Sequence, residues 1–81
     1  MNPMVKSVQY QSPYMLILAF SNNEVREFNF NGYLGYPVYE VLKDESFCQK
    51  AKVFNGIVVW DDSTDFDPDT LFVESKPLIN A

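Results

Sequence analysis

An asparagine followed by a glycine, at residues 55–56, constrains the fold of this chain more than any other feature. The pair lies within AKVFNGIVVW, between two runs rich in β-branched and aromatic residues. Asn-Gly suits the two central positions of a type I′ turn, because both positions need positive φ angles. The segment therefore predicts a β-hairpin with these strand residues: Val53, Phe54, Ile57, Val58, Val59 and Trp60.

The N-terminal half predicts further strands. YMLILAF, at residues 14–20, is a continuous apolar run of strand length, typical of a central strand covered on both faces. EVREFNF, at residues 24–30, alternates between two faces, and the asparagines before it tolerate the positive φ of a tight turn. MVKSVQY, at residues 4–10, predicts a shorter strand that ends before Pro13, because proline donates no ladder hydrogen bond.

A short helical insert is predicted between the hairpins. Pro37 can begin a helix, since the first helical position needs no N–H donor. Three apolar residues then follow at helical spacing: Val38, Val41 and Leu42. Asp44 is the expected N-cap of a second short helix, ESFCQK, with Phe47 as its buried anchor. The pattern predicts an α+β fold: a small antiparallel sheet of two hairpins with one or two short helices.

The length of 81 residues fits one domain, residues 1–81, with no linker and no second domain. The core of so small a domain supplies only about 3–5 kcal/mol of net stability. The single cysteine, Cys48, excludes an internal disulfide and indicates a small buried residue in a reducing compartment. The longest apolar run has seven residues, far below the roughly 20 of a membrane helix. We therefore expect a cytoplasmic protein with no membrane association.

Charge is unevenly distributed along the chain. Residues 1–39 carry two basic and two acidic side chains, whereas residues 40–81 carry four lysines and nine acids, which gives the net charge of −5. Nucleic-acid binding needs a basic stripe, and an acidic chain repels phosphate. The composition therefore predicts no direct nucleic-acid contact and favours a basic protein partner.

Five aspartates lie within residues 61–69, which raises the question of a cation site. Asp65, Asp67 and Asp69 match the first three ligand positions of an EF-hand loop, but Thr70 stands where that loop needs glycine and Lys76 where it needs glutamate. The chain has no histidine, so soft-ligand sites are disfavoured. A weak divalent-cation or small-ligand site in the acidic turn 61–69 remains the alternative function.

Catalysis has little support in this sequence. Paired carboxylates act as acid and base when burial separates their pKa values, whereas aspartates crowded on a surface turn stay ionised and alike. A cysteine without a histidine partner makes no nucleophilic triad. We therefore expect no enzyme activity, no catalytic residue, no bound metal and no cofactor.

A structural role explains the aspartates better. Asp67 is a suitable N-cap, Pro68 a suitable first helical residue, and Asp69 faces the positive end of the helix dipole. Asp61 and Asp62 continue from a strand end into a turn, in which Asp65 is expected to accept bonds from backbone amides. Three tyrosines recur at intervals of three residues: Tyr33, Tyr36 and Tyr39. A role in the core is the preferred interpretation, and a contact patch on the surface is the second, since tyrosine is enriched in binding surfaces. With Asp61 and Asp62, the three tyrosines are the candidate partner contacts.

The segment VVWDDSTDFDPDTLFVES resembles the C-terminal motif of a small prokaryotic family, the domain-of-unknown-function family 2442. These residues occupy the motif: Trp60, Asp65, Phe66, Asp67, Pro68, Asp69, Leu71 and Phe72. The strand, turn, strand unit at residues 14–30 is similar as well. Relatives often have Pro-x-Gly after the tryptophan, where this chain has Asp61-Asp62-Ser63.

The resemblance implies a small α+β domain without an established enzyme activity. Members are often encoded beside another small protein, in an arrangement like a toxin and its antitoxin. Some relatives carry an additional helix-turn-helix domain, which this chain does not reach, so a repressor role is not expected. We expect a protein-binding module, antitoxin-like, that binds another small and basic protein, and exposed apolar area would indicate such a partner or a homodimer.

Overall fold

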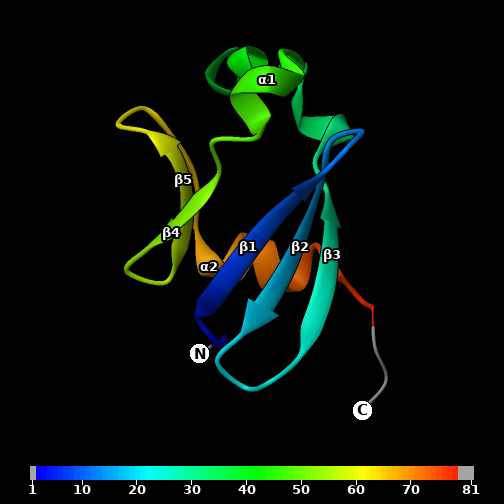
Figure 1. The fold of residues 1–81 in the computed structure, drawn as a ribbon, viewed down its shortest axis with the longest axis vertical. Helices are drawn as coiled ribbons and strands as arrows, with labels where there is room; N and C mark the ends of the chain where they lie inside the picture. The colour runs from blue at the N-terminus through cyan, green and yellow to red at the C-terminus, as the bar shows by residue number, and fades with distance from the viewer. Residues whose placement is uncertain (1, 79–81) are drawn as a thin grey trace.

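The computed structural model describes residues 2–78 and confirms an α+β fold (Figure 1). Its elements follow in chain order: β1 (Val5–Gln11), β2 (Met15–Phe20), β3 (Val25–Asn29), the 3₁₀ segments η1 (Asn31–Tyr33) and η2 (Pro37–Lys43), α1 (Glu45–Cys48), β4 (Lys52–Phe54), β5 (Ile57–Asp61), β6 (Thr64–Phe66), α2 (Pro68–Val73) and β7 (Lys76–Pro77). Within residues 2–78, no helix combines the length and apolar character of a membrane span.

The first sheet is antiparallel and has the order β1-β2-β3-β7. The predicted strand, turn, strand unit is confirmed, with Leu16 paired to Phe28 and Leu18 to Arg26. β2 lies between β1 and β3, which confirms the predicted central strand. One of its faces is fully buried, whereas the other is half-buried, so the predicted cover is complete on one face only. The last residues, KPLINA at 76–81, carry no strand pattern in the sequence, which predicts that they fray or lie along the surface. Residues 76–77 pair with β3 instead, and residues 79–81 lie outside the described residues.

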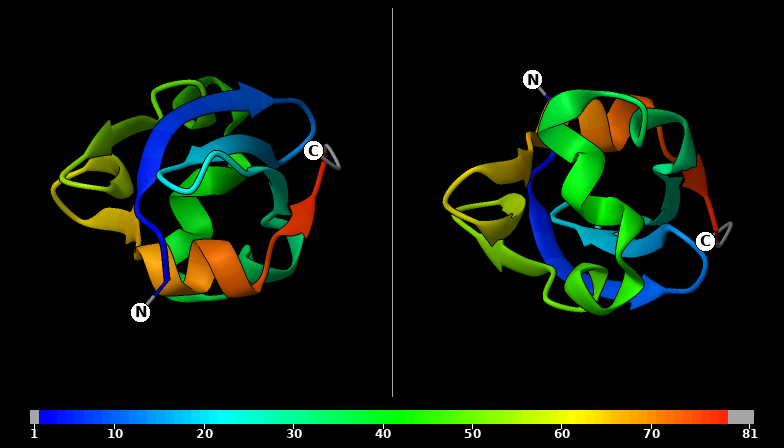
Figure 2. Two further views of the ribbon diagram at one scale, coloured as in Figure 1. Left: turned by 90° about the horizontal axis from the view of Figure 1, so that it is seen from below. Right: turned by 90° about the horizontal axis from the view of Figure 1, so that it is seen from above.

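The second sheet has the order β4-β5-β6 and projects from the side of the first (Figure 2). Asn55 and Gly56 have φ angles of 51° and 84°, which confirms the predicted tight turn between β4 and β5. The amide of Val5 donates to the Gly56 carbonyl at 3.0 Å, and this bond joins the two sheets at the hairpin tip.

An aromatic cluster around Phe66 fills the space between the two sheets. Its ring stacks on Tyr39 with a centroid distance of 4.4 Å and meets Phe28 edge-on at 5.1 Å. Tyr33 and Trp60 approach the same ring at 5.2 Å and 5.9 Å. Phe66 thus connects β3, β5 and the helical insert within one apolar core.

The helical insert differs from its prediction. The segment after Pro37 is a 3₁₀ helix, in which residues three apart align on one ridge. Val38 and Val41 therefore share an exposed ridge, and only Leu42 is buried. In α1, Asp44 is the N-cap as predicted, since its carboxylate accepts from the Ser46 amide, whereas the buried residue is Cys48 and Phe47 is half-buried.

Arg26 attaches α2 to β3. Its guanidinium donates to Ser75 Oγ at 2.7 Å and to the Ser75 carbonyl at 2.8 Å, and it lies 4.4 Å from the centroid of the Phe72 ring. Glu24 accepts a further bond at 2.8 Å. α2 lies across the inner side of the curved first sheet (Figure 2, left), so this contact closes one end of the core.

Candidate functional site

The outer face of the β4-β5-β6 sheet carries the candidate site. Side chains alternate along β5, so that Val58 and Trp60 enter the core while Ile57, Val59 and Asp61 face outward. The register places Lys52 opposite Val59 and Val59 opposite Asp65. A lysine, a valine and an aspartate therefore form a row across the three strands.

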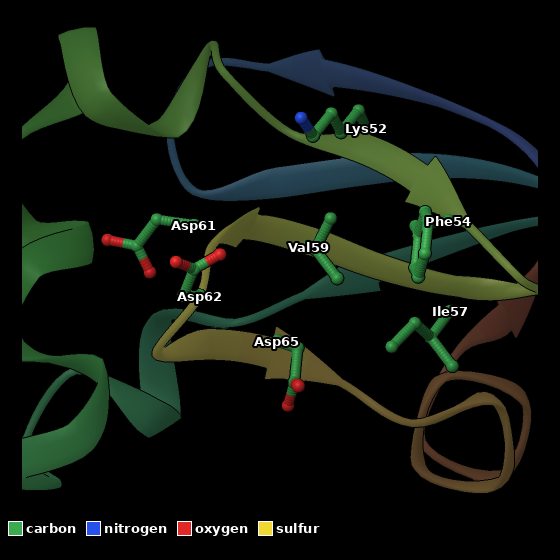
Figure 3. A pocket seen from close by; sticks show the side chains of 7 residues that line it. All are labelled: Lys52, Phe54, Ile57, Val59, Asp61, Asp62 and Asp65. Atoms are coloured by element: carbon green, nitrogen blue, oxygen red, sulfur yellow. The ribbon is translucent and has the colours of Figure 1, made fainter.

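A shallow hollow of about 390 Å³ lies over this face (Figure 3). Its lining comes from β4, β5, β6 and the turn between the last two: Lys52, Phe54, Ile57, Val59, Asp61, Asp62 and Asp65. Figure 3 shows Phe54 and Ile57 at one end and Asp61 and Asp62 at the other. We call this surface the outer hollow; it has an apolar end, an acidic end and a net charge of −2 from three aspartates and one lysine.

The turn that follows Trp60 holds the acidic end of the outer hollow. Asp61 Oδ1 accepts from the Ser63 amide at 2.9 Å, which is the geometry of an Asx turn. Asp62 is exposed at the tip. The φ angle of Ser63 is not positive. This position therefore does not need the left-handed backbone conformation that a glycine would allow.

Asp65 is placed differently from its prediction. The sequence assigned it to a turn, where it would accept from nearby amides, but it lies in the strand β6 with an exposed side chain. Alternation explains the result, because Thr64 and Phe66 on either side are buried. A strand of three residues, in a segment rich in aspartate, leaves too weak a pattern to recognise from sequence.

The side chains that could bind a metal ion lie apart in the described part of the chain. Among residues 2–78, no three side chains of the histidine, cysteine, aspartate or glutamate types come close enough to hold an ion together. Cys48 is buried, its thiol donates to the Leu42 carbonyl at 3.0 Å, and burial raises its pKa. This environment fits the structural role expected for the cysteine.

The three tyrosines divide between core and surface. Tyr33 and Tyr39 are half-buried and pack against Phe66, whereas Tyr36 is 58% exposed. Tyr39 Oη donates to the Asp65 carbonyl at 3.1 Å, and burial, reinforced by the Asp65 charge, raises the pKa of Tyr39. The core assignment therefore describes two of them, and Tyr36 is the one that presents most of its ring to solvent.

The rest of the C-terminal motif has structural roles. Trp60 is buried, and its Nε1 donates to the Cys48 carbonyl at 2.9 Å. Asp67 is the N-cap of α2 as predicted, with Oδ2 accepting from the Thr70 amide at 3.2 Å. Pro68 is the first helical residue, Asp69 lies in the first turn and Leu71 is fully buried.

Asp67→Ala should lower the free energy of unfolding by about 0.5–2 kcal/mol, the usual cost of losing an N-cap. Hydrogen bonds from Thr70 hold the pKa of the Asp67 carboxyl below its ordinary value of 3.8. Because the folded pKa is depressed, this stabilisation is present above the unfolded pKa and is lost as pH falls through the folded pKa. Urea unfolding at pH 7 and pH 3 should show a difference between variant and parent that shrinks at the lower pH.

The matched control is Asp62→Ala, which removes an exposed aspartate from the neighbouring turn. Its stability should stay within about 0.5 kcal/mol of the parent at both pH values. An equal loss in the two variants would contradict the capping role.

Sequence reasoning did not single out the apolar part of the outer hollow. It placed Phe54, Ile57 and Val59 in strands without assigning them a face. A usable signal was present, because a two-residue turn puts Phe54 opposite Ile57, and the alternation along β5 then places Val59 and Asp61 on that same face.

Comparison with known proteins gives one structural likeness and one family. No curated protein matches the chain. The crystal structure of "Putative DNA Binding Protein NE0471" from Nitrosomonas europaea ATCC 19718 is similar, with a TM-score of 0.78 and 24% identity over 89% of this chain and 48% of that one. This likeness shows a shared fold, and the chain spans about half the length of that protein.

The family match covers nearly all of the described structure. It spans residues 5–77, from the first residue of β1 to the last residue of β7, and so includes both sheets, the helical insert and the outer hollow. The chain belongs to the family described as Protein of unknown function (DUF2442).

Proposed function

We propose that this chain is a non-enzymatic protein-binding module that binds a small basic protein, in the manner of an antitoxin, through the outer hollow. The hollow itself is the observation that carries the proposal. It combines exposed apolar side chains with three aspartates on one sheet face. Protein contact surfaces combine an apolar, aromatic-rich part with a polar, solvent-accessible part.

Phe54 supplies the apolar part of the argument. Its side chain is 60% exposed, although it lies in a regular strand beside Ile57. Burying a phenylalanine is worth about 1.5–3 kcal/mol relative to leaving it in water. A partner that covers Phe54 and Ile57 would gain the part of this energy that belongs to the exposed 60% of Phe54, which makes Phe54 the expected anchor.

The charges specify the kind of partner. Asp61 and Asp62 lie at the acidic end of the hollow, Asp65 lies beside Val59 in its middle, and the whole chain carries −5. Complementary charge raises association rates and suppresses wrong partners more than it raises affinity. A basic partner therefore fits this surface better than a neutral or acidic one.

The name of the Nitrosomonas protein raises the question of DNA. Half of that protein lies outside the similar region. In this chain the outer hollow is acidic, and an acidic surface repels the phosphate backbone. The electrostatics therefore favour a protein partner. No arrangement of the described carboxylates favours the divalent-cation alternative.

Co-expression with the product of the adjacent small reading frame tests the proposal. We expect the two proteins to co-purify at low salt, with an association rate that falls about tenfold or more between 50 and 500 mM NaCl. A triple variant, Asp61→Asn, Asp62→Asn and Asp65→Asn, should lose most of this salt dependence. Failure to co-purify at low salt, or an unchanged salt dependence in the triple variant, would count against the proposed function.

A further inference from the structure

Contacts with the rest of the domain interrupt both sides of the β4-β5-β6 sheet, which limits how a partner strand can be added. On the β6 side, the Asp65 carbonyl accepts a bond from Tyr39 Oη at 3.1 Å. On the β4 side, the strand lies against β1, and the Gly56 carbonyl at the hairpin tip accepts from the Val5 amide. A partner strand needs a continuous free edge, and these contacts interrupt both edges, so the face of the sheet is the better binding surface.

An element that lies on a sheet face receives no backbone hydrogen bonds from that sheet. A single extended segment would bury unpaired N–H and C=O groups there, at a cost of several kcal/mol. A helix pairs these groups internally. Three strands at about 4.8 Å spacing give a face roughly 10 Å wide, and one helix is about 10 Å across. One helix therefore has the width of the outer hollow, and its backbone groups are already paired when it lies there.

The length of the hollow sets the pattern of this helix. Ile57, Val59 and Asp61 are spaced along one face of β5. At about 3.3 Å per residue, Val59 lies roughly 7 Å and Asp61 roughly 13 Å from Ile57. A helix rises about 1.5 Å per residue, so apolar residues at i and i+4 are about 6 Å apart and a residue at i+8 is about 12 Å from the first.

We propose that the outer hollow takes an amphipathic helix of the basic partner, with apolar residues at i and i+4 over Phe54, Ile57 and Val59, and arginine or lysine at i+8 and i+11 against the aspartates. This inference rests on the proposed function and names the element of the partner that is bound. The four positions share one helical face. Charge at one end and apolar contact at the other fix the direction of the helix.

A second copy of this chain fits the hollow less well. Two such surfaces placed face to face would bring together six aspartates and two lysines, doubling the net charge from −2 to −4. Like charges facing each other across an interface oppose association. The charge balance therefore selects a basic helix over a homodimer.

The test uses an alanine-based peptide of about 16 residues with leucine at i and i+4 and arginine at i+8 and i+11. The control peptide has the same composition with both arginines on the opposite face. We expect the first peptide to shift backbone amide NMR signals of residues 52–65 and to bind about tenfold or more tightly than the control. Phe54→Ser, and separately the pair Asp61→Asn with Asp62→Asn at the acidic end, should each weaken binding about tenfold.

Val73→Ser is the matched control variant, because Val73 is 64% exposed on α2, outside the hollow. It should leave peptide affinity unchanged. Equal binding of both peptides, shifts spread beyond the hollow, or equal effects of Val73→Ser and Phe54→Ser would overturn the helical occupant. Self-association of the free chain that Phe54→Ser abolishes would overturn it in favour of a second copy.

The two proposals fail in different ways. If the adjacent gene product binds and Phe54→Ser weakens that complex, but the helical peptide does not bind, the helix is wrong and the protein-binding function stands. If neither the gene product nor the basic peptide binds at low salt, both proposals fail.

Discussion

Phe66→Ala should leave the domain largely unfolded at 25 °C. Truncation of a fully buried phenylalanine costs about 3–5 kcal/mol, and a domain of this size has a margin of about the same magnitude. Phe66 is 1% exposed and contacts the rings of four other aromatic residues: Phe28, Tyr33, Tyr39 and Trp60. The expected result is loss of the near-ultraviolet circular dichroism signal of the packed aromatics.

Two further variants test whether the loss of stability comes from the buried packing of Phe66 or from the removal of any phenylalanine ring. Phe66→Leu keeps most of the apolar volume and should retain a cooperative, less stable fold. Phe54→Ala removes a phenylalanine that is 60% exposed, and its stability should change by no more than about 0.5 kcal/mol. If Phe66→Ala unfolds in urea at the same midpoint as Phe54→Ala, the ring cluster does not hold the sheets together.

Arg26→Ala should lower the free energy of unfolding by about 2–4 kcal/mol. Hydrogen bonds to a charged group are worth about 1.5–3 kcal/mol each and are not additive, and a desolvated cation over a ring adds up to about 2 kcal/mol. The side chain of Arg26 is only 12% exposed, and its loss removes two bonds to Ser75 and the contact with Phe72. Urea unfolding at neutral pH measures the loss.

Two variants test whether the geometry of Arg26 matters. Lys50 lies over the Phe47 ring at 5.6 Å but is solvent-exposed, so Lys50→Ala should cost less than about 0.5 kcal/mol. Arg26→Lys keeps the positive charge but loses the two parallel N–H donors of the guanidinium group, so it should recover only part of the stability. Full recovery by lysine would show that charge alone, without the paired bonds to Ser75, anchors α2.

Local chemistry explains why much of this fold is predictable from sequence. The turn at Asn55 and Gly56 requires positive φ at two positions, which few residue pairs supply. The caps at Asp44 and Asp67 depend on a side chain and a backbone amide two or three residues away. These features lie within a few neighbouring residues, so the sequence pattern contains nearly all of their physical cause.

The features that were missed depend on distant contacts. β7 is a strand because residues 76–77 pair with β3, about 50 positions earlier. The 3₁₀ path of residues 37–43 turns Val38 and Val41 outward, although their spacing suggested a buried helical face. In such segments tertiary contacts outweigh the local pattern.

The candidate site was predictable only in part. The sequence identified Asp61 and Asp62 by their charge, and they do lie in the outer hollow. It also grouped Tyr33 and Tyr39 with them, but those rings are held against Phe66. The exposed Phe54 looked like any core residue, because hydrophobicity predicts burial and does not say which face of a strand is covered.

The hydrogen bond between the Val5 amide and the Gly56 carbonyl limits how this domain can vary in length. Hairpin tips usually accept inserted residues, since they end in solvent. Here the Gly56 carbonyl at the tip also accepts a hydrogen bond from the first strand, and the positive φ of 84° at Gly56 disfavours any other residue there. An insertion at the tip between β4 and β5 would therefore break a contact between the two sheets, which an insertion at a solvent-exposed turn would not.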